Sequence, residues 1–172
     1  VGSPQIDRWL RIAYIGRGFS TPNYRRVRQP TASGNNNDHD TMSKLSLLDL
    51  GFFIAETAAS PKHVGGLLIF QRPPKAGAGF AKNLYQAYVA ATDVKPPFNR
   101  VIQFPLGALP HWQAIDKLDM SQHVYFHTLP KAGNDRKALY DFVSRLHTPM
   151  LDRSRPLWEV HVIDGLPEGK FA

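Results

Sequence analysis

Residues 154–166 read SRPLWEVHVIDGL, and this stretch constrains the fold more than any other part of the chain. Pro156 has a fixed φ angle and favours an extended residue before it, so the chain leaves the preceding loop in a set direction. The alternating side chains that follow predict a strand from Leu157 to Ile163, and Asp164-Gly165 supplies the turn chemistry that ends it. We expect the other elements to be arranged around this strand.

The two faces of this predicted strand differ in character. With a period of two, Trp158, Val160 and Val162 point to one wholly apolar face, which is expected to lie in the core with Trp158 as its large buried anchor. The opposite face is mixed and carries Leu157, Glu159, His161 and Ile163. Glu159 and His161 are therefore expected to face either solvent or a cleft.

From Met42 onward the chain alternates predicted helices and strands, which is typical of an α/β fold with a mixed sheet and flanking helices. Ser46, followed by Asp49, predicts the start of the first short helix, and Asn134 is expected to cap the last one. Apolar periodicity predicts helices at 46–54, 80–91 and 134–146, strands at 63–70 and 123–129, and a short extended piece at 100–104. The core face of the second helix is expected to carry Phe80, Leu84, Ala87, Tyr88 and Ala91.

The predicted strand at residues 63–70 reads HVGGLLIF. Its apolar side chains fall on both faces, so we expect it to lie in the interior of a sheet. Two roles are open for Gly65 and Gly66. They could allow the close approach of another backbone or a ligand, or they could form a β-bulge, and the β-bulge is favoured.

Charge and cysteine content exclude several classes of function. The 172 residues carry a formal net charge of +7 with a pI near 9.8, so we expect an anionic partner such as nucleic acid, anionic lipid or acyl-CoA. No nucleic-acid motif is present, and the basic residues outside residues 1–41 are scattered, so we expect no nucleic-acid binding. The absence of cysteine excludes disulfides, thiolate zinc sites and a cysteine nucleophile. No apolar run approaches the ~18 residues that a membrane span needs.

Residues 1–41 differ in kind from the rest. They are basic and end in the polar tract TASGNNNDHDT, so we expect a basic, disordered N-terminal extension. A short basic amphipathic helix near residues 6–14 that lies on a membrane surface is the alternative. The chain begins with Val1 and ends within an apolar run, so we expect residues 42–172 to be an incomplete N-terminal domain of a longer protein.

Few side chains are placed for catalysis. His161 and Asp164 imitate an H-x-x-x-D-G site but are one residue too close, and positions three apart on a strand point to opposite faces, so we interpret the pair as a decoy. His123 and His127 share a strand face but lie roughly 13 Å apart, too far for a shared metal, and are expected to be partly exposed. The sequence has no G-x-S-x-G turn, P-loop or dinucleotide fingerprint.

Three segments carry a resemblance to a known family. In chain order they are LSLLD, HVGGL and PLWEVHVIDGL, and together they resemble the bacterial wax ester synthase/acyl-CoA:diacylglycerol acyltransferase family. That family has the fold of CoA-dependent acyltransferases related to chloramphenicol acetyltransferase, which consists of two α/β halves with a tunnel between them. The resemblance implies that residues 42–172 form most of the first half.

The resemblance also implies a reaction. In the family, a histidine of an H-H-x-x-x-D-G motif acts as the general base that removes the proton of an alcohol, which then attacks the acyl-CoA thioester. This motif is absent from the chain and is expected after Ala172. We therefore expect no catalytic residue, no metal and no bound cofactor in this chain, and no activity from residues 1–172 alone.

The implied substrates are acyl-CoA and a fatty alcohol or diacylglycerol, which would give wax esters or triacylglycerol. The resemblance implies that His63, Gly65 and Gly66 line the substrate site, although a local structural role for His63 is favoured. The structural motif of the family corresponds to Pro156, Leu157 and Trp158. We expect a cytoplasmic protein, either free or peripheral at the inner face of the membrane or on lipid droplets.

Two other interpretations stay open. A condensation-type acyltransferase domain has the same fold and would use the same downstream motif. A non-catalytic basic protein would instead bind membrane or nucleic acid through residues 1–41. The residues that follow Ala172 would separate these interpretations.

Overall fold

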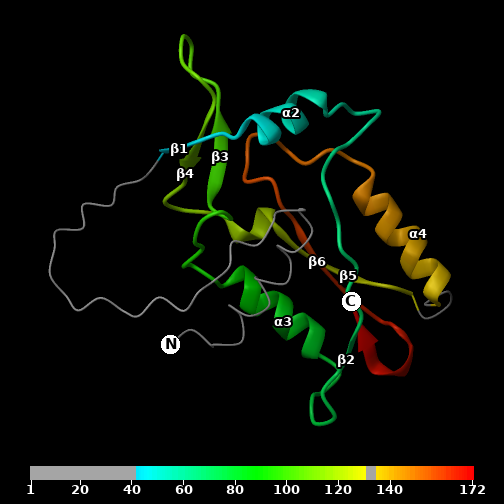
Figure 1. The fold of residues 1–172 in the computed structure, drawn as a ribbon. Helices are drawn as coiled ribbons and strands as arrows, with labels where there is room; N and C mark the ends of the chain where they lie inside the picture. The colour runs from blue at the N-terminus through cyan, green and yellow to red at the C-terminus, as the bar shows by residue number, and fades with distance from the viewer. Residues whose placement is uncertain (1–41, 131–134) are drawn as a thin grey trace, which may run out of the picture.

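The computed structural model describes residues 42–130 and 135–172 (Figure 1). The expectation of a disordered extension at residues 1–41 falls outside the described residues. Helices are α2 Leu47–Ala55, α3 Phe80–Val89 and α4 Arg136–His147, with 3-10 turns η1 Met120–Gln122 and η2 Pro167–Gly169. Strands are β1 Met42–Lys44, β2 Phe70–Gln71, β3 Arg100–Gln103, β4 His111–Ala114, β5 Val124–Thr128, β6 Val160–Asp164 and β7 Lys170–Phe171.

The central layer consists of β5, β6, β7 and β2, side by side. β5 and β6 run parallel, with Val124 opposite Val160 and Thr128 opposite Asp164. β7 lies against β6 through two backbone hydrogen bonds between Ile163 and Ala172, of 2.8 and 2.9 Å. β2 pairs antiparallel with β7 on the far side. This mixed arrangement of parallel and antiparallel strands confirms the α/β fold class.

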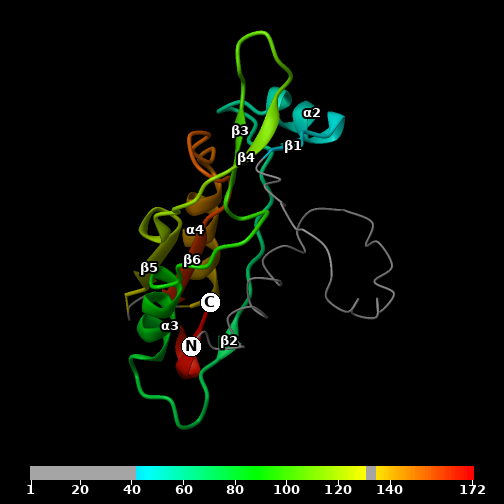
Figure 2. The same ribbon diagram turned by 90° about the vertical axis from the view of Figure 1, so that its left-hand side faces the viewer.

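Helices cover both faces of this layer, as the two views show (Figures 1 and 2). Against α3, one core cluster contains Ala81, Val162 and Phe171. Against α4, a second core cluster contains Leu129, Leu139, Ile163 and Leu166. Neighbouring residues of β6 thus enter different cores, because successive side chains of a strand point to opposite faces.

A second, smaller sheet has the order β1-β4-β3, with all neighbours antiparallel. β3 agrees with the extended piece predicted at 100–104. Neither β1 nor β4 was predicted, because the Pro- and Gly-rich flanks of β4 mask the short alternation in HWQA. The sheet lies at the end of the molecule near α2 (Figure 1).

The prediction of a strand from His63 to Phe70 is wrong for most of its length. Only Phe70 and the following Gln71 form a strand, whereas residues 61–69 are extended backbone without regular pairing. Val64 is 64% exposed and Leu68 is 46% exposed, so the segment is not interior in this structure. Within the described residues no strand lies against it, and apolar composition alone cannot supply one. A β-bulge at the glycines is excluded for the same reason, since a bulge requires a paired strand.

The strand predicted from Leu157 begins at Val160 instead, so Trp158 precedes it. Trp158 is half-buried rather than enclosed in a wholly apolar face, and Val160 is also half-buried. The most buried residues of β6 are Val162 and Ile163, which lie on opposite faces. The assumption of one core face was wrong because α3 and α4 cover both faces of the strand.

The predicted helix caps and the predicted burial of individual side chains differ from the structure in smaller ways. The Ser46 hydroxyl accepts a hydrogen bond from the Asp49 backbone N–H, as predicted. The N-cap of α4 is Asp135, whose carboxylate accepts from the Ala138 N–H, whereas Asn134 lies outside the described residues. Ala87 is exposed rather than in the core face of α3. His123 is 2% exposed, against the expectation of a partly exposed histidine.

Candidate functional site

A polar cluster forms where three distant parts of the chain meet. Glu56 follows α2, His63 lies in the extended segment 61–69, His147 ends α4, and Arg153 lies in the loop before β6. The sequence placed His63 among the candidate substrate-binding residues. It gave no signal for the other three, because nearly one hundred residues separate Glu56 from Arg153.

Glu56 is the centre of this cluster. Its Oε1 accepts a hydrogen bond of 2.9 Å from the Lys62 backbone N–H and lies 3.7 Å from Nδ1 of His63. Its Oε2 accepts a hydrogen bond of 3.2 Å from the Arg153 guanidinium. Burial raises the pKa of Glu56, but the Lys62 and Arg153 hydrogen bonds and the nearby positive charge outweigh it and hold the pKa below its usual value. The carboxylate is therefore ionised at neutral pH.

Arg153 fastens the loop before β6 to α2. Its Nη2 donates to the Phe53 carbonyl oxygen at 2.7 Å, and its guanidinium lies 3.8 Å from the centroid of the Phe53 ring. An arginine can make both contacts because its planar group donates at the edge and stacks on the face. Arg153 therefore links the end of α2 to the loop before β6.

The two glycines Gly65 and Gly66 have different surroundings. A Cβ atom added to Gly65 would lie 2.7 Å from Cδ2 of His147, whereas a Cβ atom at Gly66 would meet nothing within 4 Å in the described structure. Gly65 is thus needed for the close approach of the His147 ring, which also packs on His63 with a centroid distance of 4.4 Å. Nδ1 of His63 is buried and has no hydrogen-bond partner among the described residues.

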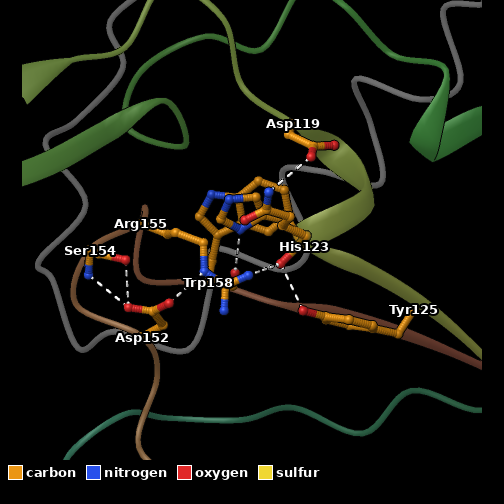
Figure 3. Close-up of polar contacts among 8 residues, drawn as sticks. Asp119, His123, Tyr125, Asp152, Ser154, Arg155 and Trp158 are labelled. Atoms are coloured by element: carbon orange, nitrogen blue, oxygen red, sulfur yellow. Dashed lines mark hydrogen bonds and ion pairs between the residues drawn. The ribbon is translucent and has the colours of Figure 1, made fainter.

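The Pro156-Leu157-Trp158 motif anchors the start of β6 through Trp158, whose ring lies against His123 (Figure 3). Pro156 is buried, and Leu157 is half-buried. The Trp158 indole N–H donates to the Phe98 carbonyl oxygen at 2.7 Å, and its ring stacks on His123 with a centroid distance of 4.4 Å. His123 Nδ1 hydrogen bonds to the Trp158 carbonyl oxygen at 2.9 Å. These contacts fix the start of β6 against the start of β5.

The loop before this anchor is organised by Asp152 and Arg155. Asp152 accepts hydrogen bonds from the backbone N–H and hydroxyl of Ser154, which lower the pKa of its carboxyl group. Arg155 donates to Asp152 at 3.0 Å and to the Gln122 carbonyl oxygen at 2.6 Å. The shallow depression here, which is lined by His123, Asp152, Arg155 and Trp158 among others, encloses no cavity of ligand size between the described residues.

A second histidine pair lies across β5 and β6. Nε2 of His127 lies 3.0 Å from Nδ1 of His161, and Nε2 of His161 lies 3.1 Å from Oε2 of Glu159. Burial, with the neighbouring His161 as a second cause, lowers the pKa of His127. The sequence did not predict this pair, because contact depends on the register that places Tyr125 opposite His161.

The apparent His161 and Asp164 motif does not form a site. Asp164 lies 3.5 Å from the Arg72 guanidinium, on the opposite side of β6 from His161. The two side chains have separate partners, in agreement with the strand geometry that marks them as a decoy. Across residues 42–130 and 135–172, no group of three or more histidine, aspartate or glutamate side chains could hold a metal ion.

Comparison with known proteins identifies the family. Residues 45–172 match the wax ester synthase/diacylglycerol acyltransferase catalytic domain. The chain belongs to this family. The match includes all three segments that carry the resemblance in the sequence, and it begins at Leu45, close to the start of the described residues.

Individual relatives and a solved structure support the same family. Rv3740c of Mycobacterium tuberculosis, whose name describes a diacylglycerol O-acyltransferase, is 40% identical over 130 residues, which is 74% of this chain and 29% of that protein. The similarly named tgs2 of the same organism is 39% identical over 126 residues, covering 72% of this chain and 28% of its own length. The solved wax ester synthase/diacylglycerol acyltransferase of Marinobacter aquaeolei VT8 is 36% identical with a TM-score of 0.70, covering 75% of this chain and 32% of that one.

These matches confirm the predicted family and the acyltransferase type of α/β fold. The chain spans about 29% of the length of Rv3740c, so two thirds or more of such a relative has no counterpart here. In the part of the chain that the structure describes, no helix has both the length and the apolar character that crossing a membrane requires.

Proposed function

We propose that the family member containing this chain is an acyl-CoA-dependent O-acyltransferase, which transfers a fatty acyl group to a fatty alcohol or a diacylglycerol. The observation that carries the proposal is the family match over residues 45–172, together with 40% identity to Rv3740c. The products would be wax esters or triacylglycerol. This function accounts for the three ordered segments better than a basic membrane- or nucleic-acid-binding protein does.

The proposed reaction needs a base for the acceptor alcohol, because a neutral hydroxyl is a poor nucleophile. The base removes the hydroxyl proton, the oxygen attacks the thioester carbonyl, and the carbon–sulfur bond breaks as the ester carbon–oxygen bond forms. The proton ends on the released CoA thiol. We place the base in an H-H-x-x-x-D-G segment outside residues 1–172, since this sequence does not contain that motif.

Within this chain, we assign His63, Gly65 and Gly66 to the wall of the acyl-CoA site. The open space beside Gly66 leaves its backbone accessible to a ligand, and the buried Nδ1 of His63 has no hydrogen-bond partner among the described residues. Gly65 contributes indirectly, because it makes room for the His147 ring that packs on His63. The Glu56 and Arg153 ion pair holds this segment beside the loop before β6.

The activity is tested with the longer protein, palmitoyl-CoA and either hexadecanol or a diacylglycerol. We expect CoA release and ester formation that depend on the acceptor, and we expect residues 1–172 alone to release no CoA above background. A folded longer protein that forms no ester with any acceptor would overturn the proposed function.

The substrate-site assignment has its own test. His63→Ala in the longer protein is expected to raise KM for palmitoyl-CoA several-fold, because the substitution removes a group from the wall of that site. His111→Ala on β4 is the matched control and is expected to leave KM unchanged. Equal KM values for both variants and the unmodified enzyme would show that His63 does not line the substrate site.

A further inference from the structure

His63 and Glu56 form a pair whose geometry constrains the histidine. Nδ1 of His63 lies 3.7 Å from Oε1 of Glu56, and the side chains are only 13% and 9% exposed, respectively. Nδ1 is buried and forms no hydrogen bond with any described residue. A distance of 3.7 Å is longer than a hydrogen bond, but the charge of the carboxylate acts on Nδ1 with little screening by solvent. This charge therefore bears on which nitrogen of His63 carries the proton.

Glu56 is held in place by groups other than His63. Its Oε1 accepts a hydrogen bond of 2.9 Å from the Lys62 backbone N–H, and its Oε2 accepts one of 3.2 Å from the Arg153 guanidinium. Arg153 is fixed in turn by its contacts with Phe53. The carboxylate is ionised at neutral pH and can only accept hydrogen bonds. A fixed acceptor thus faces Nδ1 of His63.

The proton of a neutral His63 has two possible positions, because an imidazole has one N–H group and one lone pair. If Nδ1 carried the lone pair, this lone pair would be buried and would face a negative charge, which both burial and charge disfavour. With the proton on Nδ1, the N–H group faces an acceptor instead. Nε2 then carries the lone pair.

The ring of His147 holds the His63 ring from another element. The two rings pack with a centroid distance of 4.4 Å and an interplanar angle of 54°. Gly65 permits this contact, because a Cβ atom there would lie 2.7 Å from Cδ2 of His147. The segment that follows α2 passes the end of α4 at this point (Figure 1). His63 is thus held between the ends of two helices, close to the open space beside Gly66.

We propose that Glu56 is a positioning residue that keeps the proton of His63 on Nδ1, so that Nε2 accepts a hydrogen bond from an amide N–H group of the pantetheine arm of acyl-CoA. This inference rests on the proposed function and on the assignment of His63 to the wall of the acyl-CoA site. A lone pair selects a hydrogen-bond donor. The phosphate groups of CoA and the thioester carbonyl only accept hydrogen bonds, whereas the pantetheine arm contains amide N–H groups. His63 therefore contacts the arm rather than the phosphate groups.

The nitrogen chemical shifts of the His63 ring in the longer protein test the tautomer, because a nitrogen with a proton and a nitrogen with a lone pair have distinct shifts. The signals of His63 are those that disappear in His63→Ala. We expect the proton on Nδ1 in the unmodified protein at neutral pH. Glu56→Ala removes the carboxylate and should move the proton toward Nε2, the position that a histidine side chain favours in water. Arg153→Lys is the matched control, since it changes the other side-chain partner of Glu56 but keeps the carboxylate, and should leave the proton on Nδ1.

Equilibrium binding of two ligands to the longer protein tests the contact with the arm. Palmitoyl-CoA and S-palmitoyl-pantetheine share the arm, but only palmitoyl-CoA carries phosphate groups. His63→Ala should weaken the binding of both ligands several-fold and by the same factor, because the lost hydrogen bond is to the part that they share.

Four results would overturn the proposal. A lone pair on Nδ1 in the unmodified protein, or a proton that stays on Nδ1 in Glu56→Ala, would show that Glu56 does not position His63. A loss of affinity confined to palmitoyl-CoA would place a protonated His63 against phosphate, and unchanged affinity for both ligands would remove His63 from the site.

The test is separate from that of the proposed function. The tautomer and the binding of both ligands are measured without turnover, so a protein that forms no ester would contradict the proposed function and not the role of Glu56. The tautomer of the unmodified protein and the comparison of ligands also do not require that Glu56→Ala folds.

Discussion

Trp158 joins three separate parts of the chain through one side chain. Its indole N–H bonds to the Phe98 carbonyl, its ring stacks on His123, and its backbone precedes β6. The residue was expected to be a core anchor within a strand, and it is instead a half-buried anchor outside the strand. Its importance for stability therefore comes from linking segments rather than from filling one apolar face.

We predict that Trp158→Ala lowers the free energy of unfolding by about 3 kcal/mol, the low end of the range for truncating a large buried aromatic residue. Trp158→Phe keeps part of the ring contact with His123 but removes the indole N–H that donates to the Phe98 carbonyl oxygen, and should cost about 1 kcal/mol. Denaturant unfolding of the longer protein measures both.

Glu159→Ala is the neighbouring control for Trp158. Its side chain is 26% exposed and pairs with His161, and among the described residues it has no other ion pair, so the variant should lose less than about 1 kcal/mol. Activity across acyl chain lengths is measured in parallel. A Trp158→Ala enzyme of unchanged stability but altered chain-length preference would assign Trp158 to the substrate tunnel instead.

The histidine pair predicts a dependence of stability on pH. The pKa of His127 in the folded chain lies below its usual value of 6.5, because burial and the neighbouring His161 disfavour its charged form. As pH falls through about 6.5, the unfolded chain binds a proton that the folded chain does not. Stability should be greatest above this pH and should decline on acidification toward the lower folded-state pKa.

Unfolding of the unmodified protein and of His127→Gln, measured between about pH 8 and pH 5, checks this prediction. The substitution should reduce the decline, because glutamine does not titrate. His111→Gln on β4 removes a histidine from outside the pair and should leave the decline unchanged. Identical pH profiles for all three proteins would contradict the role of His127.

At the level of elements, α4 contacts the extended segment 63–69 through the ring of His147. His147, the last residue of α4, lies over Gly65 and packs on His63. The segment has few other contacts of this kind, because its larger side chains are exposed. The fit between helix and segment therefore depends on the missing Cβ atom at Gly65.

We predict that Gly65→Ala destabilises the fold by about 1 to 3 kcal/mol, the usual cost of overpacking. The added methyl group would lie 2.7 Å from the His147 ring, which must move. Gly66→Ala meets nothing within 4 Å in the described structure and should change stability by less than about 0.5 kcal/mol. Thermal unfolding of both variants gives the comparison.

A double variant isolates the cause. If the clash explains the loss, Gly65→Ala should cost much less in a His147→Ala background, and the two substitutions should be strongly non-additive. Additive losses would show that Gly65 is required for another reason, such as contact with polypeptide outside the described residues.

For the whole molecule, the longer protein is predicted to keep its fold when residues 1–41 are deleted. The N-terminal stretch lacks a sustained apolar pattern and ends in a polar tract, so we expect it to contribute little buried surface. Deleting it from the longer protein should shift the melting temperature by less than about 2 °C, which corresponds to less than about 1 kcal/mol in a domain of this size. A fall of several degrees would show that the stretch packs on the domain.

Short-range patterns in the sequence were enough to predict most of the local elements and the family. The Ser46 cap, the helices α3 and α4 and the strand β5 follow from short-range patterns, because capping and periodicity involve residues close together in the chain. The separation of His161 from Asp164 follows from strand geometry in the same way. The ordered LSLLD, HVGGL and PLWEVHVIDGL segments were enough to indicate the family.

Contacts between distant residues could not be predicted in this way. The cluster of Glu56, His63, His147 and Arg153 and the contact of His127 with His161 depend on register and packing between distant segments, and no local pattern encodes them. Residues 63–69 also show that local sequence does not predict tertiary pairing. Their composition fits an interior strand, but a strand becomes interior only when a neighbour supplies hydrogen bonds along its edge, and the described residues contain none for this segment.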